Sequence, residues 1–272
     1  MKEKFSVLMS VYHKDDPTYL DTALNSLTEQ TAVPDEIVLV KDGPVSQQLE
    51  GVIDAFHKKF SNLKIVALEK NSGLGNALNQ GLKHCSHELV ARMDSDDISK
   101  PHRFEKQLHI FETNKFIDVV SSWIDEFIDI KENTVSTRKI PETTEEIACY
   151  AKSRCPVNHP SVMFRKSAVL SAGNYQPFPL FEDYYLWARM LLNNAKFYNI
   201  QESLLWFRTT SDTYKRRGGL KHAIDEIQFQ KFLLKSNFIN IPTFFENIAI
   251  RFCVRIMPNG LRAFIYKKIL RR

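Results

Sequence analysis

Three carboxylates lie within residues 93–97, directly after a short apolar run that is typical of the end of a buried strand. So close together, Asp94, Asp96 and Asp97 repel one another unless a cation lies among them. Carboxylate oxygens suit Mg²⁺ or Mn²⁺, and such an ion keeps positions open for the phosphates of a ligand. The spacing therefore indicates a nucleotide diphosphate site. A solvated turn in which Asp97 caps the helix expected near Pro101 is the alternative.

Further groups able to do chemistry follow other predicted strands. After the second strand, the carboxylate of Asp42 can accept an N–H from a pyrimidine, and Gly43 lets the backbone approach closely. A simple Asp-Gly-Pro turn is the alternative there. Gly73–Asn76 opens a helix, whose free N–H groups and dipole favour an anion or a ribose-phosphate segment. Ser10–Tyr12 and Lys70–Asn71 complete the polar clusters at the strand ends.

These clusters need a scaffold that brings strand ends together, and the first hundred residues alternate strand and helix patterns. Repeated βα units predict a mostly parallel, Rossmann-like sheet flanked by helices, which binds ligands beyond the carboxyl ends of its strands. The predicted strands are residues 5–11, 36–40, 64–68 and 88–92, and the predicted helices begin at Pro17, near Leu49 and at Leu74.

The second half is expected to pack on the same sheet, and with no repeat or Gly/Ser linker a single α/β domain is predicted up to about residue 235. Its periodicity predicts helices, a pair of strands and two further extended segments. The helices are Pro101–Thr113, Thr144–Ala151 and Glu182–Asn193; the paired strands are Ile117–Trp123 and Glu126–Ile130; the extended segments are Ser161–Phe164 and Phe197–Phe207.

The composition is that of an ordinary folded protein of 272 residues, with 43% hydrophobic residues and a net charge of +5. No apolar run is long enough for a spanning helix, and no signal peptide is recognisable, so a cytoplasmic location is expected. The cysteines form no CxxC pair and no zinc spacing, which predicts neither disulfides nor zinc.

Motifs in a fixed order carry a family resemblance. They resemble those of family 2 glycosyltransferases, and the motifs beyond residue 150 resemble those of bacterial enzymes that build O-antigen and exopolysaccharide repeat units on a lipid carrier. The matching segments are Ser6–Tyr12, Val38–Gly43, Asn71–Gly81, Met93–Asp97, Asn158–Pro160, Phe181–Tyr184 and Arg216–Gly219.

The resemblance implies a GT-A fold, a UDP-sugar donor, Mn²⁺ or Mg²⁺ and inversion at the anomeric carbon. It assigns Asp94 to the ribose and the metal, and Asp96 to the metal. Lys41 stands where many relatives carry an acid, which leaves Asp42 as the candidate for the uracil contact. The residues expected to bind the donor are Val11, Tyr12, Asp42, Asn71, Gly73, Asn76, Asp94 and Ser95.

An inverting transfer needs a base that removes a hydroxyl proton from the acceptor. Asp183 is the candidate, because Glu182–Asp183 opens a helix after a loop and the family pattern points to the same residue; a helix-capping acid is the alternative. Glu182 and His159 are expected near the acceptor or its diphosphate. Basic residues before Gly218 are expected to close over a diphosphate, or else to form a solvated charged segment. They are Arg208, Arg216 and Arg217.

The last residues predict a basic amphipathic tail. Residues 1–235 are expected to form the GT-A catalytic domain, with a nucleotide-sugar-binding half at 1–100 and an acceptor-binding half at 101–235, followed by the tail at 236–272. Apolar residues from Phe244 recur at helical spacing among arginines and lysines, which suits the inner face of a membrane. A helical pair that packs on the catalytic domain is the alternative.

Together these patterns predict an enzyme that moves a single hexose, glucose or galactose, from a UDP-sugar to an undecaprenyl-diphosphate-linked saccharide with a β-glycosidic bond. The product would serve O-antigen, capsule or exopolysaccharide synthesis at the inner membrane surface. Absence of a QxxRW motif favours single addition over polymerisation, and no nucleic acid partner is expected. A nucleotidyltransferase and a catalytically silent sugar-nucleotide-binding subunit are the alternatives.

Overall fold

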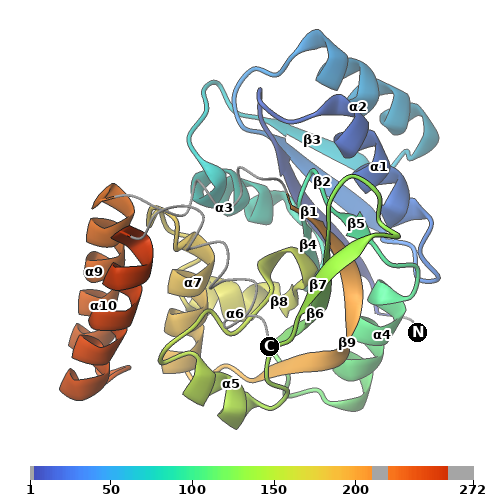
Figure 1. Ribbon diagram of the computed structural model, residues 1–272. Coiled ribbons are helices and arrows are strands. Elements are labelled where there is room, and N and C mark those ends of the chain that lie inside the picture. The colour runs from blue at the N-terminus through green and yellow to red at the C-terminus, as the bar shows by residue number, and fades with distance from the viewer. Residues whose placement is uncertain (1–2, 210–219, 257–272) are drawn as a thin grey trace.

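The computed structural model describes residues 3–209 and 220–256, and side chains within 3–209 and 224–251 (Figure 1). One sheet forms the centre of the described part, and helices cover both of its faces. Its strands run in the order β3-β2-β1-β4-β8-β6-β9-β5, and β7 pairs with β6.

The N-terminal half is the predicted succession of βα units, and the parallel pairing of β1, β2, β3 and β4 is confirmed. Asp16 caps the first helix by accepting N–H bonds from Thr18 and Tyr19, and Pro17 takes the first helical position, as the sequence predicts. The elements are β1 (Phe5–Val11), α1 (Pro17–Thr28), β2 (Glu36–Lys41), α2 (Gln47–Lys59), β3 (Leu63–Ala67), α3 (Leu74–His84) and β4 (Leu89–Met93).

Apolar side chains on the two faces of this sheet form two separate cores. Along β1, Val7 and Met9 point into the core under α1, α2 and α4, whereas Leu8 points into the core under α3 and α7. Gly81 of α3 lies so close to the sheet that an added Cβ would come within 2.5 Å of Leu8 and Val40 side chains. This close packing fixes α3, and with it the loop before α3.

The second half adds strands of mixed direction to the same sheet. β8 runs antiparallel to both β4 and β6, whereas β6 and β9 are parallel. The elements are β5 (Ile98–Ser99), α4 (Arg103–Thr113), β6 (Val119–Phe127), β7 (Thr134–Arg138), α5 (Thr144–Tyr150), the 3₁₀ turn η1 (His159–Ser161), β8 (Met163–Arg165), α6 (Lys166–Ser171), α7 (Glu182–Leu192) and β9 (Phe197–Arg208).

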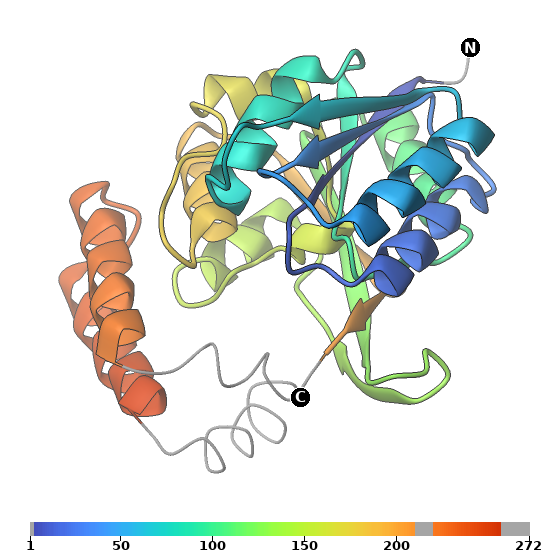
Figure 2. The same ribbon diagram turned by 90° about the horizontal axis from the view of Figure 1, so that it is seen from above.

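The predicted strand pair Ile117–Trp123 with Glu126–Ile130 is wrong. A single strand, β6, runs through both segments, and its hairpin partner is β7; Figure 2 shows this hairpin extending beyond the sheet. The polar residue Asp125, which lies between the two predicted strands, is held within β6 because its carboxylate accepts bonds from Lys100 Nζ at 2.6 Å and Thr137 Oγ1 at 2.6 Å.

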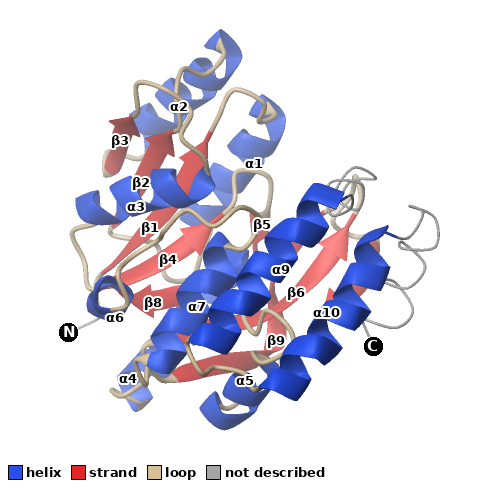
Figure 3. Cartoon of the chain, turned by 90° about the vertical axis from the view of Figure 1, so that its left-hand side faces the viewer, coloured by secondary structure: helices blue, strands red, loops and turns tan. Residues whose placement is uncertain are grey.

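Two helices, α9 (Leu220–Lys235) and α10 (Ile241–Ile256), pack beside α7 (Figures 1 and 3). Phe229 of α9 stacks on Phe181 with ring centroids 4.9 Å apart and also contacts Tyr184. In α10, Asn247 donates to Gln230 Oε1 and to a backbone carbonyl of the 151–157 loop. The beginning of the predicted tail therefore packs on the rest of the protein, while 257–272 lie outside the described residues. Within the described part, every helix is too short or too polar to cross a membrane.

Candidate functional site

The acidic loop after β4 lies at the carboxyl edge of the parallel strands, as predicted. Asp94 forms an ion pair with the guanidinium of Arg92, which is only 1% exposed. Arg103 Nη2 in turn donates to the Arg92 carbonyl at 2.7 Å. Arg92 Nε and Nη1 have no hydrogen-bond partner in the structure. A buried cation thus fixes the orientation of the first carboxylate of the motif.

A second carboxylate, Asp15, connects the β1 loop to the acidic loop. Its Oδ2 accepts the Tyr12 N–H at 3.1 Å and the Ser95 hydroxyl at 2.8 Å. Burial raises the pKa of Asp15 to about 6, and the negative charge of Asp94 adds to this shift. The sequence reasoning missed Asp15. Its place three residues after Tyr12, where its carboxylate can close a turn on the Tyr12 N–H, is the signal that could have revealed it.

Asp96 and Asp97 have different surroundings although they are neighbours. The Asp96 side chain projects from the surface, yet desolvation by its crowded loop, with the charges of Asp94 and Asp15, raises its pKa to about 6. Asp97 is fully buried, and its Oδ1 accepts the Arg208 N–H at 2.9 Å. The predicted capping role of Asp97 is wrong, since α4 begins at Arg103 and Asp97 instead ties the acidic loop to β9.

Arg208 lies on the donor side of the site. Its Nε donates to the Asp96 carbonyl at 2.9 Å, and its guanidinium stacks 3.8 Å from the Tyr19 ring centroid. The side chain contacts Phe127 as well, and the residue is 7% exposed. Arg208 thus braces the acidic loop in the described structure. The other two predicted basic residues, Arg216 and Arg217, lie outside the described residues.

The acidic loop fits a metal ion that is shared with a ligand. Asp94 and Asp96 supply carboxylate oxygens, which hard divalent cations prefer. Among the described residues, no three His, Cys, Asp or Glu side chains gather as a complete metal cage. Mg²⁺ sites that use one or two carboxylates, with substrate phosphates and water as the other ligands, need no such cage.

Asp42 holds the loop that leads into α3. Its Oδ1 accepts the Ser72 N–H at 2.7 Å and its Oδ2 accepts the Gly73 N–H at 3.0 Å. The adjacent Gly43 has φ +83° and lies against this loop, where an added Cβ would come 2.5 Å from Asn71 N. Asn71 Nδ2 also donates to the Asp42 carbonyl. The carboxylate that we expect at the uracil therefore also shapes the wall beside it.

The first hundred residues and the second half of the chain meet where α3 and α7 begin. A Cβ built on Gly75 would lie 3.0 Å from Glu182 Cγ, so the first turn of α3 touches the first turn of α7. Asn76 Nδ2 donates back to the Ser72 carbonyl at 3.0 Å, which closes the turn at the start of α3. At β1, the Val11 carbonyl accepts the Asp42 N–H at 2.8 Å. The predicted donor-binding residues thus line one edge.

Asp183, the predicted base, lies in the first turn of α7. Its Oδ1 accepts the Tyr184 N–H at 2.7 Å, and its Oδ2 lies 3.6 Å from Cys155 Sγ. Burial raises the pKa of Asp183, while the positive charges of Arg138 and Arg92 oppose this shift. A carboxylate whose pKa is raised toward neutrality suits a general base.

Tyr175 is a buried residue near both carboxylates: burial raises the pKa of its hydroxyl, the charge of Arg92 opposes this shift, and the charges of Asp183 and Asp94 add to it. His159 Nε2 is 2.9 Å from Tyr175 Oη, and the imidazole lies edge-on to Trp187. Burial and then the charge of Arg92 hold the pKa of His159 well below its usual value, so the ring is neutral. His159, which we expected near the acceptor or its diphosphate, is thus 8% exposed and is anchored beneath the site.

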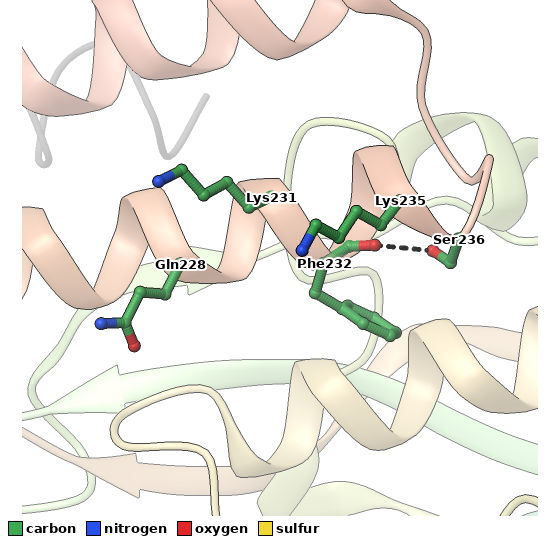
Figure 4. Close-up of a pocket in the computed structure, with 5 residues that line it drawn as sticks. All are labelled: Gln228, Lys231, Phe232, Lys235 and Ser236. Atoms are coloured by element: carbon green, nitrogen blue, oxygen red, sulfur yellow. Dashed lines mark hydrogen bonds between the residues drawn. The ribbon is translucent and has the colours of Figure 1, made fainter.

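Two hollows among the described residues lie on the α9–α10 pair and include no residue of the acidic loop. Figure 4 shows the larger one, in which Ser236 Oγ donates to the Phe232 carbonyl of the same helix. The smaller one adjoins the α9–α10 connection. Neither contains a predicted site residue. The lining residues in Figure 4 are Gln228, Lys231, Phe232, Lys235 and Ser236.

Sequence comparisons agree with this arrangement. The family described as Glycosyl transferase family 2 matches residues 6–170. The chain is 43% identical to the UDP-Gal:alpha-D-GlcNAc-diphosphoundecaprenol beta-1,3-galactosyltransferase of Escherichia coli, over 99% of this chain and 97% of that protein. It is 39% identical to the amylovoran biosynthesis glycosyltransferase AmsE of Erwinia amylovora, over 97% of this chain and 98% of that protein.

Solved structures show the same fold at low sequence identity. S. aureus TarS in complex with UDP-GlcNAc superposes with a TM-score of 0.68 at 18% identity, covering 92% of this chain and 71% of that one. The mannosyltransferase PcManGT from Pyrobaculum calidifontis, in complex with GDP-Man and Mn2+, gives 0.64 at 14% identity, covering 96% of this chain and 72% of that one. The chain therefore has the GT-A fold and belongs to glycosyl transferase family 2.

Proposed function

We propose that this enzyme transfers one hexose, galactose in the first place, from a UDP-sugar to a saccharide linked to undecaprenyl diphosphate, and that it forms a β-glycosidic bond. The observation that carries the proposal is the contact between the first turns of α3 and α7, where Gly75 lies against Glu182, the residue before Asp183. The E. coli relative, named as a UDP-galactose transferase acting on such a lipid, supports the choice of donor and acceptor.

In this proposal the donor lies along the carboxyl edge of β1, β2 and β4. The uracil contacts Asp42 and Asn71, whose loop is already ordered by the Asp42 hydrogen bonds. Asp94 faces the ribose and the diphosphate. The N-terminus of α3, at Gly73–Asn76, supplies N–H groups with a favourable dipole for the polar parts of the donor.

A divalent cation belongs to this proposal, with Asp94 and Asp96 as its protein ligands. When bound, Mn²⁺ or Mg²⁺ would offset the negative charge that grows on the departing UDP, which can contribute several kcal/mol. The chain's own residues prepare the site. Arg92 orients Asp94, Asp15 positions Ser95, and Arg208 holds the Asp96 backbone.

The chemical step assigned to Asp183 is proton removal. As an acceptor hydroxyl oxygen bonds to the anomeric carbon, its proton passes to the carboxylate and the bond to the UDP oxygen breaks. Attack from the side opposite UDP inverts the configuration, so an α-linked donor gives a β-linked product. Glu182, beside the start of α3, is placed to orient the donor sugar or the acceptor.

A lipid-linked acceptor implies that the enzyme works at a bilayer, and we place it peripherally on the inner face of the cell membrane. The exposed face of α10 supports this placement, because Ile241 and Phe245 are 63% and 64% exposed one helical turn apart. Apolar side chains with nearby cations suit an interfacial helix. The domain division at 235 and the basic tail beyond it belong to the same proposal.

The test is a transfer assay with UDP-galactose, UDP-glucose and UDP-N-acetylglucosamine, each with a GlcNAc-diphosphate-lipid acceptor. We expect UDP release that depends on the acceptor, is fastest with UDP-galactose and stops when EDTA removes the metal. The product should show a β anomeric proton by NMR. Release of pyrophosphate from a nucleoside triphosphate, or an α-linked product, would contradict the proposal.

A further inference from the structure

Arg138, the last residue of β7, lies next to the predicted base without belonging to any motif singled out in the sequence. Its Nη2 donates to the Cys155 carbonyl at 3.1 Å, and the Cys155 thiol lies 3.6 Å from Asp183 Oδ2. Asn158 Nδ2 donates to the Arg138 carbonyl at 3.4 Å. The hairpin strand and the 155–158 segment therefore hold this guanidinium against Cys155, the residue whose thiol contacts the base.

The charge of Arg138 reaches the reacting side of the site. It lowers the pKa of the Asp183 carboxyl and of the Cys155 thiol, against the larger effect of burial on both groups. The side chain is only partly buried. A guanidinium carries five N–H donors, and the bond to the Cys155 carbonyl occupies one of them. Most of its donor capacity remains for a ligand.

Other cationic side chains near the acidic loop and near the predicted acceptor side already interact with protein groups. Arg208 is stacked on Tyr19 and bound to the Asp96 carbonyl, on the donor side. Lys100 forms an ion pair with Asp125 at 2.6 Å. Lys139, directly after Arg138, lies over the Trp123 ring at 4.8 Å. Arg138 thus combines nearness to Asp183 with partial exposure.

We infer that Arg138 forms the subsite for the acceptor's diphosphate, and this inference rests on the proposed function. In a saccharyl diphosphate, the hydroxyl that attacks and the diphosphate on the anomeric carbon lie on the same sugar ring. A cation separated from the base only by Cys155 can therefore bind the diphosphate while the hydroxyl contacts Asp183. A planar guanidinium can bind two phosphate oxygens at once. Such binding fixes the orientation of the sugar ring and also compensates the charge of the diphosphate.

The subsite makes the enzyme selective for a chemical class of acceptor. A neutral glycoside with the same sugar can reach Asp183 but leaves the guanidinium without its anion. The diphosphate adds charge-assisted hydrogen bonds to acceptor binding. Wild-type enzyme should therefore have a much lower KM for the GlcNAc-diphosphate-lipid than for an alkyl glycoside of GlcNAc, at a similar kcat.

The experiment compares Arg138→Gln with wild type on these two acceptors at saturating UDP-galactose. We expect the variant to raise the KM for the diphosphate acceptor by about 10- to 100-fold, as for the loss of charge-assisted hydrogen bonds, with little change in kcat. Its KM for the neutral glycoside and its KM for UDP-galactose should stay at wild-type values, and any change in kcat that follows from the higher pKa of Asp183 should be the same on both acceptors. Arg138→Lys, which keeps the charge but not the fork, should give an intermediate KM.

Lys139→Gln is the matched control, because it removes the same charge from the neighbouring residue and should leave both KM values unchanged. An equal loss of kcat on both acceptors in Arg138→Gln, with no rise in the KM for the diphosphate acceptor, would mean that Arg138 acts only through Cys155 and Asp183, which overturns the subsite. Equal KM values for the two acceptors in wild type would overturn it as well. Wild-type transfer to neither acceptor, with transfer to a different one, would instead refute the proposed function.

Discussion

At the scale of single residues, the acidic loop concentrates negative charge beyond what its own motif supplies. Asp15, from another loop, adds a carboxylate whose charge acts on Asp96, and both groups have a pKa of about 6. Arg92 compensates only part of this charge, through Asp94. A site with surplus negative charge and an exposed acid at its centre favours a cation together with a ligand phosphate.

A pH prediction follows from these two carboxyls. Their pKa lies above the ordinary value of 3.8, so they are deprotonated above about pH 7 and gain protons as the pH falls through 6. Protons then compete with the metal. Calorimetry in Mn²⁺ should show UDP binding that weakens steadily between about pH 7.5 and pH 5.

The stability of the metal-free protein should change with pH in the opposite direction, and it should fall as the pH rises. Because the folded protein binds these protons more tightly than the unfolded chain, the stabilisation they give is complete below about pH 4 and is lost as the pH rises through 6. Thermal melting in EDTA measures this stability.

Asp96→Asn should remove much of the pH dependence of metal-linked UDP binding, and an unchanged profile in this variant would place the metal elsewhere.

Asp183→Asn tests the base. The amide keeps the size of the side chain and can still accept the Tyr184 N–H, so the start of α7 should stay folded. It cannot take a proton, and transfer should fall by about 100-fold or more while UDP binding is unchanged. Calorimetry with UDP and a transfer assay separate the two effects. If the variant transfers at nearly the wild-type rate, Glu182 becomes the next candidate.

The sequence points to candidate site residues that belong to recognisable motifs, and it does not reveal the residues that support them. Asp42, Asp94 and Asp183 can be picked out because each follows a predicted strand or lies at the start of a predicted helix. Arg92 and Arg138 do not, since nothing in an apolar strand or a polar hairpin tells which residue will face a distant carboxylate. Such neighbours are set by tertiary packing, as the contact of Arg138 with Cys155 illustrates.

At the scale of elements, the loops at the carboxyl edge depend on one another. The β2 loop and the loop before α3 are joined by the Asp42 carboxylate on one side and by the close approach of Gly43 to Asn71 on the other. Any side chain at Gly43 meets both a positive φ and the Asn71 backbone. The geometry of the nucleotide wall therefore rests on this glycine.

Gly43→Ala should lower the free energy of unfolding by about 2 kcal/mol or more and weaken UDP binding, because the added methyl forces the two loops apart. The control is Gly51→Ala, an exposed helical position of α2 with no atom within 4 Å of the added Cβ. That substitution should stabilise the protein by about 0.5–1 kcal/mol. Chemical denaturation and UDP titration of both variants give the comparison. Equal stabilities would show that the loops adjust to the methyl group.

Element prediction succeeded where the signal was local. The βα units up to β4 have apolar strands, capped helices and turn residues in sequence, and all of them are in the structure. It failed in β6, where residues 117–123 and 126–130 were predicted as two paired strands although they belong to one strand, in which Lys100, distant in sequence, holds Asp125. The two-residue β5 was not predicted, since its pairing with β9 leaves no pattern of its own.

At the scale of the whole molecule, the α9–α10 pair has two faces with different tasks. One face is packed on the rest of the protein, through the stacking of Phe229 on Phe181 and through Asn247, whose side chain donates to the Lys152 carbonyl. The other face exposes Ile241 and Phe245. Deleting the tail from Thr243 would disrupt both faces together, so it cannot separate membrane binding from folding. Substitutions on the exposed face alone can do so.

The membrane proposal predicts that Ile241→Ser combined with Phe245→Ser abolishes sedimentation with anionic vesicles at low salt. Each apolar side chain loses about 1.5–3 kcal/mol of burial in the interface. Transfer to an acceptor embedded in vesicles should fall in parallel, whereas transfer to a water-soluble acceptor should not. In wild type, screening at 1 M salt, where the Debye length is about 3 Å, should weaken the binding without removing its apolar part.

Phe116→Ser is the control, because Phe116 is 83% exposed but lies on a turn distant in sequence from the tail. It removes one large, highly exposed apolar side chain and should leave vesicle binding unchanged. Thermal melting of the α10 variant should match wild type, since Asn247 and Arg251 keep their partners. Wild-type protein that ignores anionic vesicles at low salt would refute the placement. Equal losses in the α10 and Phe116 variants would show that general surface hydrophobicity, rather than α10, carries the enzyme to its lipid acceptor.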